Sequence, residues 1–210
     1  DYFIDLIGQV LPEVPVDRAQ IVYRFSGVRP LPGHGDLAPG FVSRDYRIEA
    51  APLPGTSGTT VLSLVGGKWT TFRASAENLA EHALELLAVP RRRSTKGLPI
   101  GGGRGYPMTE RARRQWIDAN ARGLDPARVA TLLDRYGTVA AEVIAAIADD
   151  PQDGALATVT SFSTGELRHL ARTESVVHLD DMLLRRTSLG FIGAVTAESA
   201  REVADAIAGP

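Results

Sequence analysis

The sequence predicts an α+β fold, in which a small antiparallel β region with one long helix precedes an all-α helical domain. Two observations predict this order. Apolar and polar residues alternate in short runs before residue 66, whereas from residue 109 onward apolar residues recur at the spacing of helices. A stretch rich in Arg, Gly and Pro separates the two patterns. The predicted division is therefore 1–89, a linker at 90–108 and a helical domain at 109–210.

Composition excludes several classes of site and partner. The 210 residues are 44% hydrophobic and carry a formal net charge of −2, so no broad attraction to nucleic acid or to an anionic membrane is expected. Cysteine is absent, which excludes disulfides, thiolate metal sites and cysteine nucleophiles. No apolar run approaches the roughly 18 residues of a spanning helix. Because the chain opens at Asp1 without a methionine, we expect a piece of a longer protein.

The N-terminal stretch combines a helix end with one strand. Residues 2–10 have the pattern of a helix that Pro12 terminates. Residues 19–25 alternate between apolar and polar positions, as in a half-exposed strand. Glycine and proline follow this strand directly, so we expect a bend with Arg29 in a loop at the strand end.

A hairpin is predicted next. Residues 44–50 alternate again, 52–58 have turn composition, and 59–65 are β-branched and apolar on both faces, which suits a strand covered on both sides. The two strands therefore form an antiparallel pair. So small a sheet leaves edges and a face uncovered, and we expect its missing neighbours upstream of Asp1.

A glycine turn and a long helix follow the second strand. Residues 66–67 are both glycine, Lys68 comes next, and an apolar stripe runs through 76–87 with Thr70 or Thr71 as the N-cap. A helix start at this place offers unpaired N–H groups beside a positive charge. Such a turn suits an anion or an electron-rich ring edge, although glycine pairs also serve packing alone.

The remainder predicts short helices with short connections, as in an all-α bundle. Asp125 precedes a proline at the first helical position, Gly137 ends that helix, and Ser163 with Glu166 has the pattern of a capping box. Expected starts lie near residues 109, 126, 138, 164, 179 and 196. Acidic residues before basic ones in 174–186 indicate structural ion pairs.

Three cations lie at strand ends or turns of the β region: Arg29, Arg44 and Lys68. Such a set suits a phosphate or carboxylate if the three converge, and salt bridges are the alternative. Trp69 and Trp116 suit either ring stacking or a core. The basic run at 91–93 suits either phosphate contact or a solvated linker.

Metal and dinucleotide motifs are not found. The histidines lack metal-ligand spacing, so no metal site is expected, and only His34 in its loop is considered as a base. The glycines at 101–105 follow no strand and lack the GxGxxG spacing.

Several ordered motifs resemble one enzyme family. They are FSGVRPL at 25–31, SRDY at 43–46, GGKWTTFR at 66–73, LLDRYG at 132–137, and the stretch from Glu174 through VVHLDDMLLRRTSLG. Together they make nearly the whole chain similar to the carboxy-terminal portion of FAD-dependent glycerol-3-phosphate dehydrogenases. The β region would then be the end of the FAD and substrate region.

The resemblance implies an enzyme that oxidises sn-glycerol 3-phosphate to dihydroxyacetone phosphate and passes electrons from FAD to quinone. It implies a cytoplasmic protein peripheral to the cytoplasmic membrane. Arg29 and Lys68 would hold the substrate phosphate, and Arg44 would lie near the active site. The backbone of the turn would contact the flavin pyrimidine edge through Gly66, Gly67, Lys68, Trp69 and Thr70.

The resemblance also lacks parts of the family pattern. The amino-terminal glycine fingerprint and the upstream active-site arginine and histidine are missing, and no catalytic residue is assigned to this chain. We therefore expect the isolated chain to bind FAD poorly and to be inactive. Alternatives are a glycerol-3-phosphate oxidase, which uses oxygen as acceptor, and a helical module for binding or self-association, a homodimer included.

Overall fold

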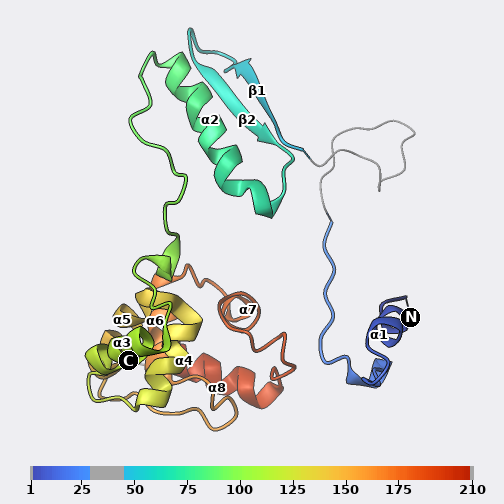
Figure 1. Cartoon of the computed structure of the whole chain (residues 1–210), viewed down its shortest axis with the longest axis vertical. Helices are drawn as coiled ribbons and strands as arrows, with labels where there is room; N and C mark the ends of the chain where they lie inside the picture. The colour runs from blue at the N-terminus through green and yellow to red at the C-terminus, as the bar shows by residue number, and fades with distance from the viewer. Residues whose placement is uncertain (1, 29–44, 209–210) are drawn as a thin grey trace. The chain divides into compact units, whose positions relative to one another are not determined.

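The computed structural model describes residues 2–28 and 45–208. They fall into two units, which Figure 1 draws in one view. The β unit comprises Ser26–Leu98, and the helical unit comprises Asp1–Phe25 with Pro99–Pro210. The domain boundaries drawn from the sequence at 89 and 108 stay a prediction.

The β unit contains one hairpin and one helix. Strands β1 (Arg47–Pro52) and β2 (Thr60–Val65) pair antiparallel, with Arg47 opposite Val65 and Pro52 opposite Thr60. The predicted hairpin is therefore confirmed. Helix α2 (Phe72–Leu86) lies along it (Figure 1).

The expectation that β2 is covered on both faces is wrong for the described residues. Val61 and Leu64 are each 40% exposed. A two-stranded sheet with one helix has an open face, so the apolar side chains of the strand lack a second layer. The apolar composition of β2 is typical of a strand buried on both faces, but the described residues cover only one face.

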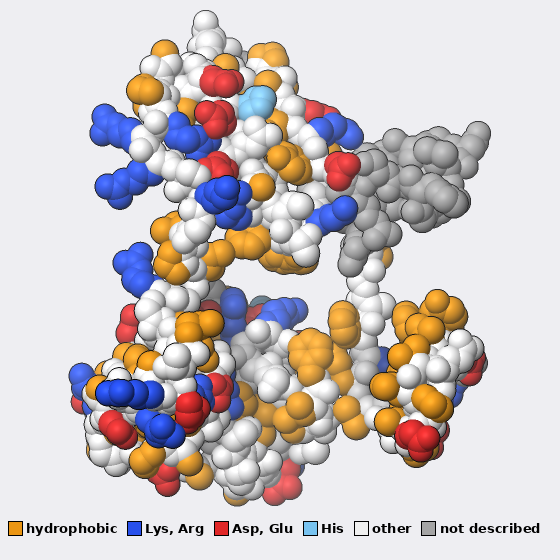
Figure 2. Space-filling view, viewed as in Figure 1, with side chains coloured by type: hydrophobic (Ala, Val, Ile, Leu, Met, Phe, Trp, Pro, Cys, Tyr) orange, Lys and Arg blue, Asp and Glu red, His pale blue; other side chains and the backbone are white. Residues whose placement is uncertain are grey.

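The helical unit opens with the predicted N-terminal helix. Its elements are α1 (Tyr2–Val10), η1 (Arg18–Gln20), η4 (Gly101–Gly103), α3 (Glu110–Asn120), α4 (Pro126–Tyr136), η5 (Gly137–Val139), α5 (Ala140–Ala148), α6 (Thr164–Thr173), α7 (Leu179–Asp181), η6 (Met182–Arg186) and α8 (Ala197–Ala208). Hydrophobic side chains cover much of the visible surface of α1 (Figure 2), and Tyr2 and Phe3 are each 73% exposed. In the described part of the chain no helix is long and apolar enough to cross a lipid bilayer.

The predicted strand at 19–25 is wrong. Residues 18–20 form η1, and residues 21–25 are irregular because the described chain offers them no strand to pair with. Instead they contact the loop after η6. The Phe191 ring centroid lies 5.4 Å from that of Tyr23 and 5.9 Å from that of Phe25, both edge to face.

Two hydrophobic clusters hold the helical unit together. One joins α3, α4 and α5 through residues such as Leu133 and Ile144, which are fully buried. The other joins α6, η6 and α8 around Leu167 and Met182. Tyr136 packs against both clusters, so α4 connects them. This arrangement is the compact helical bundle that the sequence predicts.

Helix starts agree with the sequence at α3 and α4. Thr109 Oγ1 accepts the amide of Ala112 at 3.2 Å, and Asp125 Oδ1 accepts that of Ala127 at 2.6 Å. The capping box expected before α6 is only half formed. Ser163 Oγ accepts the Glu166 amide at 3.3 Å, but the Glu166 carboxylate turns into the interior instead of returning to the cap.

The helix expected to start near residue 179 does so, but it is short and changes its winding. Helix α7 passes directly into η6, a π-helical turn that ends at Arg186. The predicted structural ion pairs are confirmed, because Arg185 contacts Asp181 at 2.8 Å and Arg186 contacts Glu174 at 3.5 Å.

Candidate functional site

The candidate site is the turn between β2 and α2. Gly66 and Gly67 have φ of +79° and +105°, a backbone conformation that side chains other than glycine rarely adopt. A Cβ added to Gly66 would lie 3.1 Å from the carbonyl oxygen of Asp45. Glycine is therefore required here by conformation and by close backbone approach.

One hydroxyl group fixes the loop that carries Lys68. Thr71 Oγ1 accepts the Lys68 amide at 3.4 Å and donates to the Lys68 carbonyl oxygen at 3.0 Å. The short helix η3 (Trp69–Thr71) then leads into α2, with Thr71 at the N-cap position as predicted. Helix α2 begins at Phe72, four residues before the apolar stripe, because η3 supplies an earlier first turn.

The turn presents a cation and backbone donors to its surroundings. Lys68 is exposed and has no carboxylate partner within 2–28 and 45–208. The amides of Trp69 and Thr70 likewise donate to no acceptor in those ranges. Unpaired N–H groups at a helix start carry positive potential, so this edge can receive an anion or an electron-rich ring edge.

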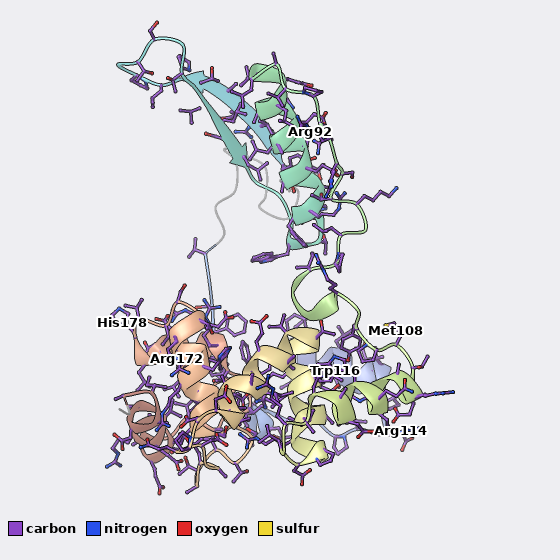
Figure 3. The ribbon with its side chains drawn as sticks, turned by 90° about the vertical axis from the view of Figure 1, so that its left-hand side faces the viewer. Arg92, Met108, Arg114, Trp116, Arg172 and His178 are labelled. Carbon is purple, nitrogen blue, oxygen red and sulfur yellow. The ribbon has the colours of Figure 1, made fainter. Side chains whose placement is uncertain are left out.

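The two tryptophans differ in their surroundings. Trp69 is 90% exposed, which excludes a core position, one of its two alternatives, within the described residues. Trp116, labelled in Figure 3, packs against the cluster of α3, α4 and α5. Exposure of a large ring beside Lys68 leaves a flat apolar face at the turn.

The structure brings one further motif to the turn. A Cβ on Gly67 would lie 3.5 Å from Cβ of Tyr46, and the Tyr46 hydroxyl accepts a 3.2 Å hydrogen bond from Asn78 on α2. The end of the SRDY motif therefore adjoins the turn. Arg44, Arg29 and His34 lie outside the described residues, so their convergence with Lys68 stays a prediction.

Sequence reasoning missed Glu77, one turn below the start of α2. Its carboxylate accepts hydrogen bonds from Arg73, Ser94 and the Thr95 amide, and it pairs with Arg91. These bonds, led by the one from the Ser94 hydroxyl, lower the pKa of Glu77 from 4.5 to about 2. The only local signal is the spacing of Arg73 and Glu77, because the other partners lie 14 to 18 residues away.

The helical unit holds a cavity of about 350 Å³ beside α4 and the start of α6. Two guanidinium groups line it, but both are paired: Arg128 with Asp153 at 2.9 Å, and Arg135 with Glu166. Arg135 also stacks 3.9 Å from the centre of the Phe162 ring. The cavity is therefore close to neutral, and its charged groups stabilise the bundle.

Three histidines lie among the described residues, at positions 82, 169 and 178. His82 is exposed on α2, and His178 is exposed before α7. Among residues 2–28 and 45–208 no group of histidine and carboxylate side chains is arranged to hold a metal ion.

Comparison with known proteins identifies the family. Residues 93–210 match the sequence family described as the C-terminal domain of alpha-glycerophosphate oxidase. The chain belongs to this family. Curated proteins named glycerol-3-phosphate dehydrogenase are similar to 99% of this chain, so the similarity extends N-terminal to that domain and includes the turn at Lys68.

Three relatives illustrate the similarity. Glycerol-3-phosphate dehydrogenase 2 of Mycobacterium tuberculosis H37Rv is 30% identical over 99% of this chain. The glycerol-3-phosphate dehydrogenase of Mycobacterium leprae is also 30% identical over 99%, and that of Pseudomonas tolaasii is 30% identical over 94%. The chain covers 34% of the first two relatives and 37% of the third, so it spans about a third of their length. The family resemblance found in the motifs is thus confirmed.

Proposed function

We propose that this chain is the C-terminal third of an FAD-dependent glycerol-3-phosphate dehydrogenase, here called the parent dehydrogenase. The parent oxidises sn-glycerol 3-phosphate to dihydroxyacetone phosphate. The observation that carries the proposal is the similarity to relatives of that name over 99% of the chain. The cationic turn at Lys68 supplies a chemically suitable element within the matched region.

Lys68 binds the substrate phosphate in this proposal. It is an exposed ammonium group on a loop that Thr71 holds, and a flexible lysine suits a phosphate as a point charge. Arg29 completes the phosphate site, and Arg44 lies close to it. Arg29 lies within the FSGVRPL motif and Arg44 within the SRDY motif. Their neighbours Val28 and Asp45 are at the edges of the described residues.

The turn also suits the edge of a flavin. The left-handed glycines allow the backbone to approach a ring closely, and the amides of Trp69 and Thr70 have no acceptor among the described residues. FAD, when bound, accepts the hydride from the substrate carbon. Gly66, Gly67, Lys68, Trp69 and Thr70 orient the ring edge and place N–H dipoles where negative charge develops.

The electron acceptor is proposed to be quinone, which places the parent at the cytoplasmic face of the cytoplasmic membrane. The relatives named as dehydrogenases favour this assignment. An oxidase that reduces oxygen is the second candidate, because the matched domain is described from an oxidase. Parallel assays of hydrogen peroxide release and of quinone reduction by the parent protein distinguish the two.

The isolated chain is proposed to be inactive, since the parent's fingerprint for the FAD pyrophosphate lies outside it. Purified chain should be colourless and should not oxidise glycerol 3-phosphate. Stoichiometric flavin in the purified chain would contradict this part of the proposal. A purely helical binding or self-association module, such as a homodimer, is disfavoured because it leaves the turn at Lys68 unexplained.

A direct test of the proposed function uses the parent dehydrogenase. Adding glycerol 3-phosphate should bleach the flavin absorbance and yield dihydroxyacetone phosphate, whereas glycerol, which lacks the phosphate, should do neither at equal concentration. Equal activity toward glycerol would exclude the phosphate site.

A further inference from the structure

The Glu77 carboxylate on α2 bonds both the segment that follows the helix and Arg73 in the first turn of α2. Glu77 Oε1 accepts the Ser94 hydroxyl at 2.5 Å and the Thr95 amide at 3.0 Å, and Oε2 accepts Arg73. Arg91, Ser94 and Thr95 of the predicted linker therefore contact α2, whereas Arg92 and Arg93 are exposed. Charged side chains of both signs lie over α2 and this segment in Figure 2.

Arg91 adds a second set of contacts to the same helix. Its Nη2 donates to the Glu77 carbonyl oxygen at 2.7 Å, and its guanidinium pairs with Glu81 at 2.6 Å. The Arg91 and Glu77 side chains are 21% and 18% exposed, so solvent reaches both only in part. Hydrogen bonds to an ionised group are stronger than neutral ones, and here several share one carboxylate.

We call the contacts of Glu77 with Arg73, Arg91, Ser94 and Thr95 the clamp. It extends toward the turn that carries Lys68. Arg73 bonds both Glu77 and Thr95 Oγ1, the latter at 3.0 Å, and it lies in the first turn of α2. Two residues on, the buried Ser75 donates to the carbonyl oxygen of Thr71 at 2.6 Å. Residues 94–95 therefore contact the first turn of α2, and the backbone of that turn connects them to the loop that holds Lys68.

We propose that Glu77 is a positioning residue: it holds residues 91–95 on α2 and keeps the first turn of α2 in the position that presents Lys68 and the amides after it. This inference deepens the proposed function and rests on it for the role of Lys68. Glu77 itself does not touch the substrate. Its effect passes through Arg73 and the backbone at Thr71.

Limited proteolysis of the 210-residue chain with trypsin tests the clamp. Arg91, Arg92 and Arg93 supply cleavage sites within residues 91–95, and Lys96 supplies one directly after them; Arg92 is labelled in Figure 3. Glu77→Ala should speed cleavage at these sites about tenfold or more, because trypsin cuts the population that has left the helix. Mass spectrometry identifies the cut sites.

A graded series supplies the controls. Glu81→Ala removes only the contact with Arg91 and should give a smaller increase. Glu85→Ala, on the same helix, removes a carboxylate that has no partner among the described residues, and it should leave cleavage unchanged. Equal cleavage rates for Glu77→Ala and Glu85→Ala would overturn the clamp.

Kinetics of the parent dehydrogenase test the positioning role. Glu77→Ala should raise KM for glycerol 3-phosphate about three- to tenfold, assayed well below the unfolding temperature. Glu77→Gln keeps an acceptor oxygen for Ser94 and Thr95 and should restore part of the loss. Faster cleavage with an unchanged KM would overturn the positioning role.

Lys68→Met in the same assay separates this inference from the proposed function. If Lys68→Met leaves KM unchanged, the assigned phosphate contact is wrong, and the proteolysis still decides the clamp. If Lys68→Met raises KM and Glu77→Ala does not, only the positioning role is overturned.

Discussion

The Tyr136 hydroxyl donates a 2.7 Å hydrogen bond to Oε1 of Glu166, a carboxylate that is 2% exposed and also pairs with Arg135. Burial and the negative charge of Glu166 raise the pKa of Tyr136 above its ordinary value, so this phenol stays protonated and donates. Since Tyr136 contacts both hydrophobic clusters, this bond lies where they meet.

Removing either partner should destabilise the helical unit to different extents. Tyr136→Phe leaves Glu166 paired with Arg135 and should cost about 1–2 kcal/mol of unfolding free energy. Glu166→Ala leaves Arg135 without its carboxylate and should cost about 3–5 kcal/mol. Urea denaturation followed by circular dichroism measures both, and equal small losses for the two variants would show that Glu166 is not the essential partner.

Gly102 and Gly137 make a close backbone contact that permits no side chain. A Cβ on Gly102 would lie 2.0 Å from the carbonyl oxygen of Tyr136. Gly102→Ala should therefore destabilise the helical unit by about 1–3 kcal/mol or more, as overpacking against backbone does. The matched control is Gly103→Ala, whose Cβ would meet nothing nearer than 3.8 Å. Thermal unfolding of both variants gives the comparison, and similar melting temperatures would contradict this contact.

The Glu77 clamp should persist far into the acid range. Its hydrogen bonds lower the pKa to about 2 in the folded chain, against 4.5 for the ordinary group. Because the folded pKa is the lower one, the contribution to stability is complete above about pH 4.5 and is lost as the pH falls through 2. Carbon-13 NMR of the side-chain carboxyl, assigned with Glu77→Gln, measures the midpoint. A midpoint near 4.5 would show that the clamp is absent in solution.

Local signals explain what the sequence predicts well. Asp125 and Thr109 mark helix starts because a cap bonds amides two or three residues away, and both are found as expected. Alternation alone predicts a strand at 19–25, but a strand also needs a neighbour, which the described chain does not provide.

Contacts between distant residues explain what the sequence does not predict. Glu166 has the spacing of a capping box, yet the buried pairing with Arg135 and Tyr136 draws its carboxylate inward. Ser94 and Thr95 reach Glu77 because the chain turns back along α2 after the helix ends, and no sequence motif predicts this turn. For the site, residue types alone predict the glycine turn and Lys68. The contacts of Glu77 that hold the first turn of α2 are found only in the structure.

The role of Lys68 in binding the substrate phosphate is tested most directly by the KM of the parent dehydrogenase for glycerol 3-phosphate. Lys68→Met removes one charged contact to phosphate, worth about 1.5–3 kcal/mol, and should raise KM about ten- to a hundredfold. Lys96→Met removes the other lysine of the chain, which lies outside the turn, and should leave KM unchanged. We predict a large increase for Lys68→Met alone. An unchanged KM in Lys68→Met, in protein that retains its flavin, would contradict the account.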